Sequence, residues 1–173
     1  YFISGSGNKK FFSNKNLELI SKALKSEQNK FNIKLCGGDT TNSSKLSFTF
    51  VSLGFSSTII KRNNAKINDD IYVTGELGDS FIGLNVLRNK IILKPFERKY
   101  FTKKYFLPDL KIDLINLISK HANTSIDVSD GLISDLEKML NNQNLSFKIN
   151  FQDIPVSKFL KKLIINNKIS FKN

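Results

Sequence analysis

The sequence predicts a mixed α/β (α+β) fold, because strand-like and helix-like stretches alternate along the chain. Alternating apolar residues over 46–53 are typical of a strand, whereas Leu17, Ile20 and Leu24 repeat at helical spacing. The chain has 173 residues, of which 40% are hydrophobic. That length suits one large domain or two small ones with a hydrophobic core.

The N-terminal part is expected to form a strand, a helix and two further strands. Residues 1–3 have the pattern of a strand end, and Asn14 or Asn16 is a suitable cap for the helix that follows. Residues 31–36 predict a second strand, and residues 46–53 predict a third whose two faces differ in burial. This part therefore predicts a small sheet accompanied by one helix.

A polar and basic stretch at 58–69 precedes a change in composition, so we place a domain boundary there. The first domain is then 1–60 and the second is 61–173. The second domain is again expected to alternate strands with helices. In order, its expected elements are a strand at 70–74, a helix over 81–87 capped by Asp79, a short helix within 94–108, a helix from Pro108, a strand at 124–128, a helix from Leu132, a strand over 145–151 and a helix after Pro155.

The net charge of +12 is compatible with a nucleic-acid partner. The basic residues, however, are overwhelmingly lysines spread along the chain, and Arg62, Arg88 and Arg98 are the three arginines. Forked guanidinium contacts to phosphates or bases are therefore scarce. We expect no nucleic-acid partner, and a basic non-enzymatic binding module stays open as an alternative.

Composition also bears on the compartment and on the available chemistry. The single cysteine excludes an internal disulfide framework and fits a reducing compartment, and the single histidine argues against a histidine-based metal site. No apolar run approaches the roughly 20 residues that span a bilayer, and the first residues do not resemble a signal peptide. We expect a cytoplasmic protein without a membrane partner.

The stretch from Thr124 to Leu132 reads as a short strand that turns directly into a helix. Ser129 and Asp130 are good N-cap residues, and Asp127 and Asp130 would lie beside the positive end of that helix. Two carboxylates there suit a hard cation, and the helix N-terminus attracts phosphate. Alternatively, Asp130 only caps the helix while Asp127 caps a turn.

A second stretch combines paired glycines with a carboxylate, in Gly37-Gly38-Asp39-Thr40-Thr41. We expect a strand that runs into a tight turn here. Paired glycines permit positive φ values and allow backbone N–H groups to approach an anion closely.

Together, Gly-Gly-Asp-Thr-Thr and the Ile-Asp-Val-Ser-Asp-Gly-Leu of 126–132 resemble the thiamine-monophosphate kinases. The stretch 61–75, continuing into 77–80 and 83–84, is similar to the middle signature of the same family. The order and spacing of all three blocks fit. The resemblance implies the two-domain ATP-binding fold of the aminoimidazole ribonucleotide synthetase-like superfamily. Residues 1–60 would be the C-terminal part of its first domain, and residues 61–173 the N-terminal part of its second.

The resemblance also implies an activity, namely the ATP- and Mg²⁺-dependent phosphorylation of thiamine phosphate to thiamine diphosphate. Another ATP-using enzyme of the same superfamily is the near alternative. Phosphoryl transfer requires mainly that the substrates are positioned and the developing charge is neutralised. The implied magnesium ligands are Asp39, Asp127 and Asp130, of which Asp130 is also the catalytic candidate, and the implied ATP-binding residues are Gly38, Arg62 and Ser129. For Arg62, a surface linker cation is the competing interpretation.

The sequence departs from the family pattern at both ends. The family's early acidic Gly-Asp-Asp-Ala-Ala segment and its later Gly-Gly-Glu-Asp-Tyr-Glu-Leu segment have no counterpart in the 173 residues. We therefore expect an internal fragment that is inactive alone. The resemblance further implies a homodimer for the full-length protein.

Overall fold

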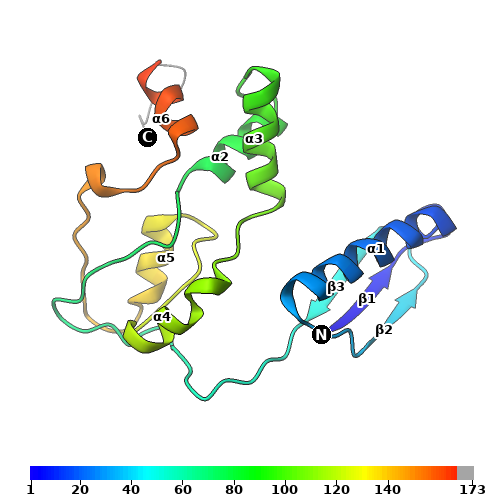
Figure 1. The fold of residues 1–173 in the computed structure, drawn as a ribbon, viewed down its shortest axis with the longest axis horizontal. Helices are drawn as coiled ribbons and strands as arrows, with labels where there is room; N and C mark the ends of the chain where they lie inside the picture. Colours follow the sequence, from blue (N-terminus) through cyan, green and yellow to red (C-terminus); the bar gives the residue numbers. More distant parts are fainter. Residues whose placement is uncertain (167–173) are drawn as a thin grey trace. The chain divides into compact units, whose positions relative to one another are not determined.

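The computed structural model describes residues 1–166 and divides the chain into two compact units, Tyr1–Ser57 and a second that begins at Thr58 (Figure 1). We call these unit 1 and unit 2 and describe each by itself. Their mixed helix and strand content confirms the predicted α/β class. The assignment of 1–60 and 61–173 to the two domains of a kinase stays a prediction.

Unit 1 contains one helix and a three-stranded sheet. Its elements are β1 (Phe2–Ser6), α1 (Asn14–Phe31), β2 (Gly37–Thr41) and β3 (Ser47–Val51). The strand order is β2-β1-β3, with β1 parallel to β2 and antiparallel to β3. The parallel pair is joined through α1, as parallel neighbours require a long crossover connection. The strands predicted at 1–3 and 46–53 and the helix predicted from Leu17, Ile20 and Leu24 are confirmed, whereas the strand predicted at 31–36 was wrong because the second strand begins at Gly37.

Helix α1 is held at its start by Ser13 rather than by the predicted Asn14 or Asn16. Ser13 has an extended backbone, and its hydroxyl accepts a hydrogen bond from the Asn16 N–H at 3.4 Å. The predicted cap was wrong because an N-cap residue must lie outside the helix, and Asn14 is already helical. The helical apolar stripe faces the sheet, where the two surfaces line a shallow hollow. Its lining residues are Ile3, Ile20, Ala23, Leu24, Phe48 and Phe50.

The paired glycines lie in a strand, not in the predicted turn. Gly37 and Gly38 are the first two residues of β2, and positive φ among the described glycines occurs at Gly75, Gly78 and Gly131. A Cβ atom on Gly38 would lie 1.9 Å from the carbonyl oxygen of Ile3 on β1. The turn prediction was therefore wrong: glycine is needed at 38 because two backbones approach closely, not because the chain reverses.

Unit 2 is helical within its described residues 58–166. Its elements are α2 (Asp79–Leu87), α3 (Pro95–Phe106), the 3₁₀ turn η1 (Ile112–Leu114), α4 (Ile115–His121), α5 (Leu132–Met139), the 3₁₀ turn η2 (Phe151–Asp153) and α6 (Lys158–Ile165). The five predicted helices are confirmed, but the one predicted to begin at Pro108 begins with the 3₁₀ turn at Ile112 and becomes an α-helix at Ile115. The predicted strands at 70–74, 124–128 and 145–151 were wrong. An alternating apolar pattern indicates a half-buried extended chain, but a strand also needs a neighbouring strand to complete its hydrogen bonds.

The hydrophobic core of unit 2 lies between α2, α3 and α6, and it consists of Ile82, Val86, Phe101, Leu160 and Leu163. Helices α2 and α3 cross closely, since a Cβ atom on Gly83 would lie 2.3 Å from the Phe101 carbonyl oxygen. The Tyr100 and Phe159 rings pack with centroids 4.2 Å apart. Phe101 of α3 is fully buried, whereas Phe96, Tyr105 and Phe106 of the same helix are exposed.

A buried carboxylate joins the same three helices. Asp79 is 4% exposed and accepts hydrogen bonds from the Tyr100 hydroxyl at 2.8 Å and the Ser157 hydroxyl at 2.7 Å. Ser157 is also the N-cap of α6, where its oxygen accepts from the Leu160 N–H. The prediction that Asp79 caps α2 was wrong: Gly78 is the N-cap, and Asp79 points into the core. Burial, and then the bond to Asp79, raise the pKa of Tyr100.

Candidate functional site

The six predicted site residues are divided between the two units. Gly38 and Asp39 lie on β2 of unit 1, where they pair in register with Ile3 and Ser4 of β1. The Asp39 carboxylate is exposed and accepts a hydrogen bond from the Thr40 N–H at 2.7 Å. Arg62, Asp127, Ser129 and Asp130 all belong to unit 2. The roles of Gly38 and Asp39 stay predictions.

In unit 2, the segment 61–65 lies along two stretches that are distant in sequence, 123–124 and 139–143. Backbone and side-chain hydrogen bonds of 2.8–3.2 Å connect them. The donors and acceptors are Thr124 Oγ1 to Lys61 O, Asn63 N to Met139 O, Asn64 Nδ2 to Asn123 O, Ala65 N to Gln143 Oε1 and Gln143 Nε2 to Ala65 O. These contacts hold the backbone on both sides of Arg62 against the loop that carries Asp127.

Asp69 secures the end of the same segment. Its carboxylate accepts a hydrogen bond from the Lys66 N–H at 2.8 Å and from the Asn123 side chain at 2.9 and 3.0 Å. Those bonds lower the pKa of Asp69, the backbone bond to Lys66 being the largest cause and the bond from Asn123 the next. The carboxylate therefore fixes both a local turn and the start of the 123–131 loop.

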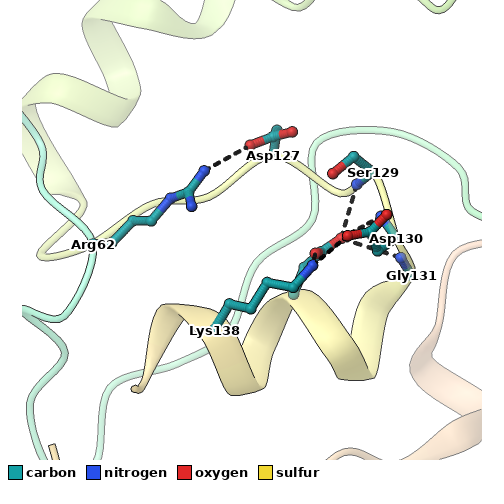
Figure 2. A network of polar contacts seen from close by, with 7 residues as sticks. Arg62, Asp127, Ser129, Asp130, Gly131 and Lys138 are labelled. Atoms are coloured by element: carbon teal, nitrogen blue, oxygen red, sulfur yellow. Dashed lines mark hydrogen bonds and ion pairs between the residues drawn. The ribbon is translucent and has the colours of Figure 1, made fainter. Parts of the chain in front are cut away.

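Arg62 and Asp127 contact each other directly, as Figure 2 shows. The Arg62 Nη2 atom lies 3.2 Å from the Asp127 Oδ1 atom, and the two side chains are 56% and 69% exposed. Two residues that were predicted to bind different parts of a metal–nucleotide complex thus form an exposed ion pair. The competing interpretation of Arg62 as a surface linker cation stays open, because an exposed ion pair fits both interpretations.

The loop before α5 is organised by Asp135, a residue of the first turn of that helix. One carboxylate oxygen, Oδ2, accepts the backbone N–H groups of Ser129, Asp130 and Gly131 at 2.8, 2.9 and 3.1 Å (Figure 2). The other oxygen, Oδ1, accepts from Lys138 at 2.8 Å. The Asp135 side chain is only 2% exposed. The ammonium of Lys138, and then the three N–H donors, hold the pKa of Asp135 well below its usual range.

Lys138 connects Asp135 to the candidate ligand Asp130. Its ammonium contacts the Asp130 Oδ2 atom as well as Asp135. The Asp130 side chain is 68% exposed, in contrast to that of Asp135. The contacts to Asp130 and Asp135 raise the pKa of Lys138.

The structure corrects three expectations about this loop. Ser129 and Asp130 are not the N-cap of α5: that position is taken by Gly131, with a φ of 127°. The backbone N–H groups at 129–131 bond to Asp135, so they are not free to bind phosphate. Ser129 keeps its hydroxyl as the group that can face a ligand. The alternative that Asp130 only caps the helix is also wrong, because its carboxylate contacts Lys138.

The donor set fits Mg²⁺ in its usual protein setting. Mg²⁺ takes oxygen ligands and is commonly held by one or two carboxylates together with substrate phosphates and water. Asp127 and Asp130 are two exposed carboxylates on one short loop. Over residues 1–166, no three His, Cys, Asp or Glu side chains gather into a group that could hold a metal by themselves. A metal here would need ligands from the substrate.

The sequence pattern did not identify Asp135 and Lys138 as residues that organise the site. Both follow the Ser-Asp-Gly motif by a few positions and lie three residues apart on α5, so they share a helix face. That spacing was a usable signal. The burial of an aspartate that accepts three backbone N–H groups could not be inferred from the pattern, because it depends on how the preceding loop folds back.

Comparison with known proteins gives consistent results across several relatives. No protein-family model matches the sequence. A thiamine-monophosphate kinase of Buchnera aphidicola subsp. Acyrthosiphon pisum is 42% identical over 135 residues, covering 76% of this chain and 42% of the relative. The thiamine-monophosphate kinase of Escherichia coli K12 is 35% identical over 149 residues, covering 84% of this chain and 46% of the relative. The chain thus spans about half the length of the curated relatives that it matches.

Solved structures share the fold. Thiamine monophosphate kinase from Aquifex aeolicus aligns over 96% of this chain and 56% of its own, with a TM-score of 0.82 and 24% identity. AaThiL complexed with AMPPCP and TMP aligns over 95% of this chain and 53% of its own, with a TM-score of 0.80 and 24% identity. Within the described residues, no helix combines the length and apolar character needed to cross a membrane.

Proposed function

Because this chain belongs to the thiamine-monophosphate kinase family, we propose that the protein transfers a phosphoryl group from ATP to thiamine phosphate with Mg²⁺. The proposal is supported by AaThiL, which is described in complex with AMPPCP, an analogue of ATP, and TMP. The products would be thiamine diphosphate and ADP.

The observation that carries the proposal is the loop that presents Asp127, Ser129 and Asp130. Its two carboxylates are exposed, while its backbone is held by Asp135. Phosphoryl transfer depends on pre-positioned charges far more than on a covalent protein intermediate. A loop with a fixed backbone and exposed carboxylates meets that requirement.

Each residue of the loop has a defined task in this proposal. Asp127 and Asp130 would hold Mg²⁺, and Asp130 is the catalytic candidate because its carboxylate would bring the charge of that ion to the site of phosphoryl transfer. When bound, Mg²⁺ neutralises charge that develops on the phosphate oxygens. The hydroxyl of Ser129 donates a hydrogen bond to ATP.

Arg62 exchanges its carboxylate partner for a phosphate in the same proposal. Its guanidinium is held near the loop by the 61–65 contacts and can place two parallel N–H donors on a phosphate. In the structure it forms an ion pair with Asp127. If Asp127 holds a metal ion, the guanidinium of Arg62 would be available for the negative charge of ATP.

The roles of Gly38 and Asp39 in unit 1, a backbone contact to phosphate and a metal ligand respectively, stay predictions of the family resemblance. A homodimer and a cytoplasmic location stay predictions.

The proposal is tested with a protein of the relatives' full length that contains this segment. We expect it to form thiamine diphosphate and ADP from thiamine phosphate and ATP, with an absolute requirement for Mg²⁺.

The Asp127→Asn variant of this protein should lose turnover by orders of magnitude and regain part of it at high Mg²⁺. Asp113→Asn, which removes an equal charge from the 3₁₀ turn η1, is the matched control. ATP consumption only with a different acceptor would contradict the substrate, and normal turnover of Asp127→Asn would contradict the metal role.

A further inference from the structure

The ammonium of Lys138 contacts two carboxylates, one buried and one exposed to solvent. Asp135 is buried with 2% of its side chain exposed, whereas Asp130 is 68% exposed. Lys138 itself is 44% exposed. Water and ions therefore reach the contact between Lys138 and Asp130 easily, but the carboxylate of Asp135 is sheltered.

The two contacts also differ in what else holds each carboxylate. Asp135 accepts three backbone N–H groups through Oδ2 and Lys138 through Oδ1, so both oxygens have partners. Asp130 contacts Lys138 through Oδ2 and is otherwise open to solvent. A divalent cation can consequently compete for Asp130, while Asp135 is already saturated.

The loop does not need the contact between Lys138 and Asp130 in order to keep its shape. Its backbone at 129–131 is fixed by the N–H bonds to Asp135, and Asp135 lies on the first turn of α5. The position of Asp130 is thus set from its backbone. Lys138 adds charge neutralisation at the carboxylate, which a metal ion can replace.

We propose that Lys138 is a resident cation that competes with the divalent metal for Asp130. When the metal binds, the ammonium leaves the Asp130 oxygen and stays on Asp135. Lys138 thereby weakens metal binding, and its single positive charge partly offsets the two negative charges of Asp130 and Asp135. This inference rests on the proposed function, since it takes Asp130 as a metal ligand.

The test measures binding of Mn²⁺, a spectroscopic substitute for Mg²⁺, to the 173-residue chain without nucleotide, with free Mn²⁺ followed by electron paramagnetic resonance. Lys138→Met should bind Mn²⁺ about two- to fivefold more tightly, the range expected for loss of one exposed ion pair. Lys148→Met removes the same charge from an exposed position of the same unit and is the matched control. The change in Mn²⁺ affinity caused by Lys148→Met measures how net charge alone affects metal binding, and we expect it to be negligible.

Thermal unfolding gives a second measurement. Without metal, Lys138→Met should melt at a lower temperature than the unmodified chain, because Asp130 and Asp135 then repel each other. Added Mg²⁺ should raise its melting temperature more than that of the unmodified chain at equal ionic strength. This rise in its melting temperature on addition of Mg²⁺ also verifies that the variant folds.

The outcomes separate this inference from the proposed function. If Asp130→Asn weakens Mn²⁺ binding but Lys138→Met leaves it unchanged or weakens it, Lys138 is a structural support and the inference is wrong. If Asp130→Asn leaves Mn²⁺ binding unchanged, Asp130 is not a ligand, and both the metal assignment and the inference fail. Tighter binding by Lys138→Met, lost again in the double variant with Asp130→Asn, supports the exchange.

Discussion

The two units differ in how their folds are held. Every buried hydrophobic side chain among residues 1–166 lies in unit 2, whereas the buried residues of unit 1 are Gly5 and Gly7. Unit 1 relies on the ladders between β1, β2 and β3 and on the cap of α1. Apolar burial is the main favourable term in folding. The stability of this chain should therefore come mainly from unit 2.

Unit 2 itself combines two modes of support. Helices α2, α3 and α6 enclose a hydrophobic core, whereas the loop at 127–131 is fixed by hydrogen bonds and charges around Asp135. Hydrogen-bonded loops can present exposed carboxylates that a hydrophobic core cannot tolerate. The part of the candidate site formed by Arg62, Asp127, Ser129 and Asp130 therefore belongs to the stable unit but not to its apolar core.

The largest expected effect is truncation of the core. Phe101→Ala should lower the free energy of unfolding of unit 2 by about 3–5 kcal/mol, because a fully buried aromatic ring leaves a cavity. Phe50→Ala on β3 of unit 1 removes a ring that is 56% exposed and should cost about 1 kcal/mol or less. Urea unfolding measures both. Equal losses would contradict the contrast between the units.

A smaller effect is expected from the two helix caps. Ser157→Ala removes the N-cap of α6 and a donor to buried Asp79, and should cost about 2 kcal/mol. Ser13→Ala removes only the N-cap of α1, and should cost about 1 kcal/mol at most. Thermal unfolding of both variants compares one cap in a core with one near the surface. A greater loss for Ser13→Ala would reverse the ranking.

Hydrogen exchange addresses the contrast without mutation. Amides within 70–151 should exchange at least about tenfold more slowly than those within 1–57, which corresponds to ~1.4 kcal/mol. Helices α2 and α3 pack into the core and should open only when it opens, whereas the strands of unit 1 lack buried side chains. Mass spectrometry of peptides from both ranges measures the rates. Higher protection in 1–57 would show that the sheet, not the helical core, is the stable part.

The smallest effect concerns pH and the loop. Because the pKa of Asp135 is lowered in the folded state, its stabilising contribution is present above the unfolded value of about 4 and is lost as pH falls through the folded pKa. The melting temperature of Asp135→Asn should therefore differ most from the unmodified chain near neutral pH, and the difference should shrink in acid. Asp113→Asn is the exposed control. A difference that grows in acid would contradict the assigned role of Asp135.

Much of the helical structure was predictable, because helices need only their own apolar spacing and a cap. The stripes at Ile20 and Leu24, and at Leu160 and Leu163, identified α1 and α6. The strand predicted at 124–128 failed for a physical reason: the segment is anchored by side chains such as Thr124, and pattern alone does not reveal whether a partner strand exists. The glycines at 37–38 were misread because crowding and turning both favour glycine.

The candidate site was predictable in part. The Ser-Asp-Gly motif located Asp127 and Asp130 on one loop, and Arg62 lies against it as an ion-pair partner. The role of Asp135 was not predictable, because its burial depends on the three N–H groups that fold back onto it. A carboxylate on a helix is normally exposed, and only the tertiary structure shows that this one is not.

The central claim is that Arg62 and the loop 127–130 form the metal–nucleotide part of unit 2. The most direct measurement is a titration of the ¹⁵N-labelled chain with Mg²⁺ and AMPPCP, followed by nuclear magnetic resonance, which detects weak binding. We expect chemical-shift changes that centre on the amides of Arg62, Asp127, Ser129 and Asp130 within unit 2. These changes should be strongly reduced in Asp127→Asn. Changes confined to exposed lysines elsewhere, or changes that persist unaltered in Asp127→Asn, would contradict it.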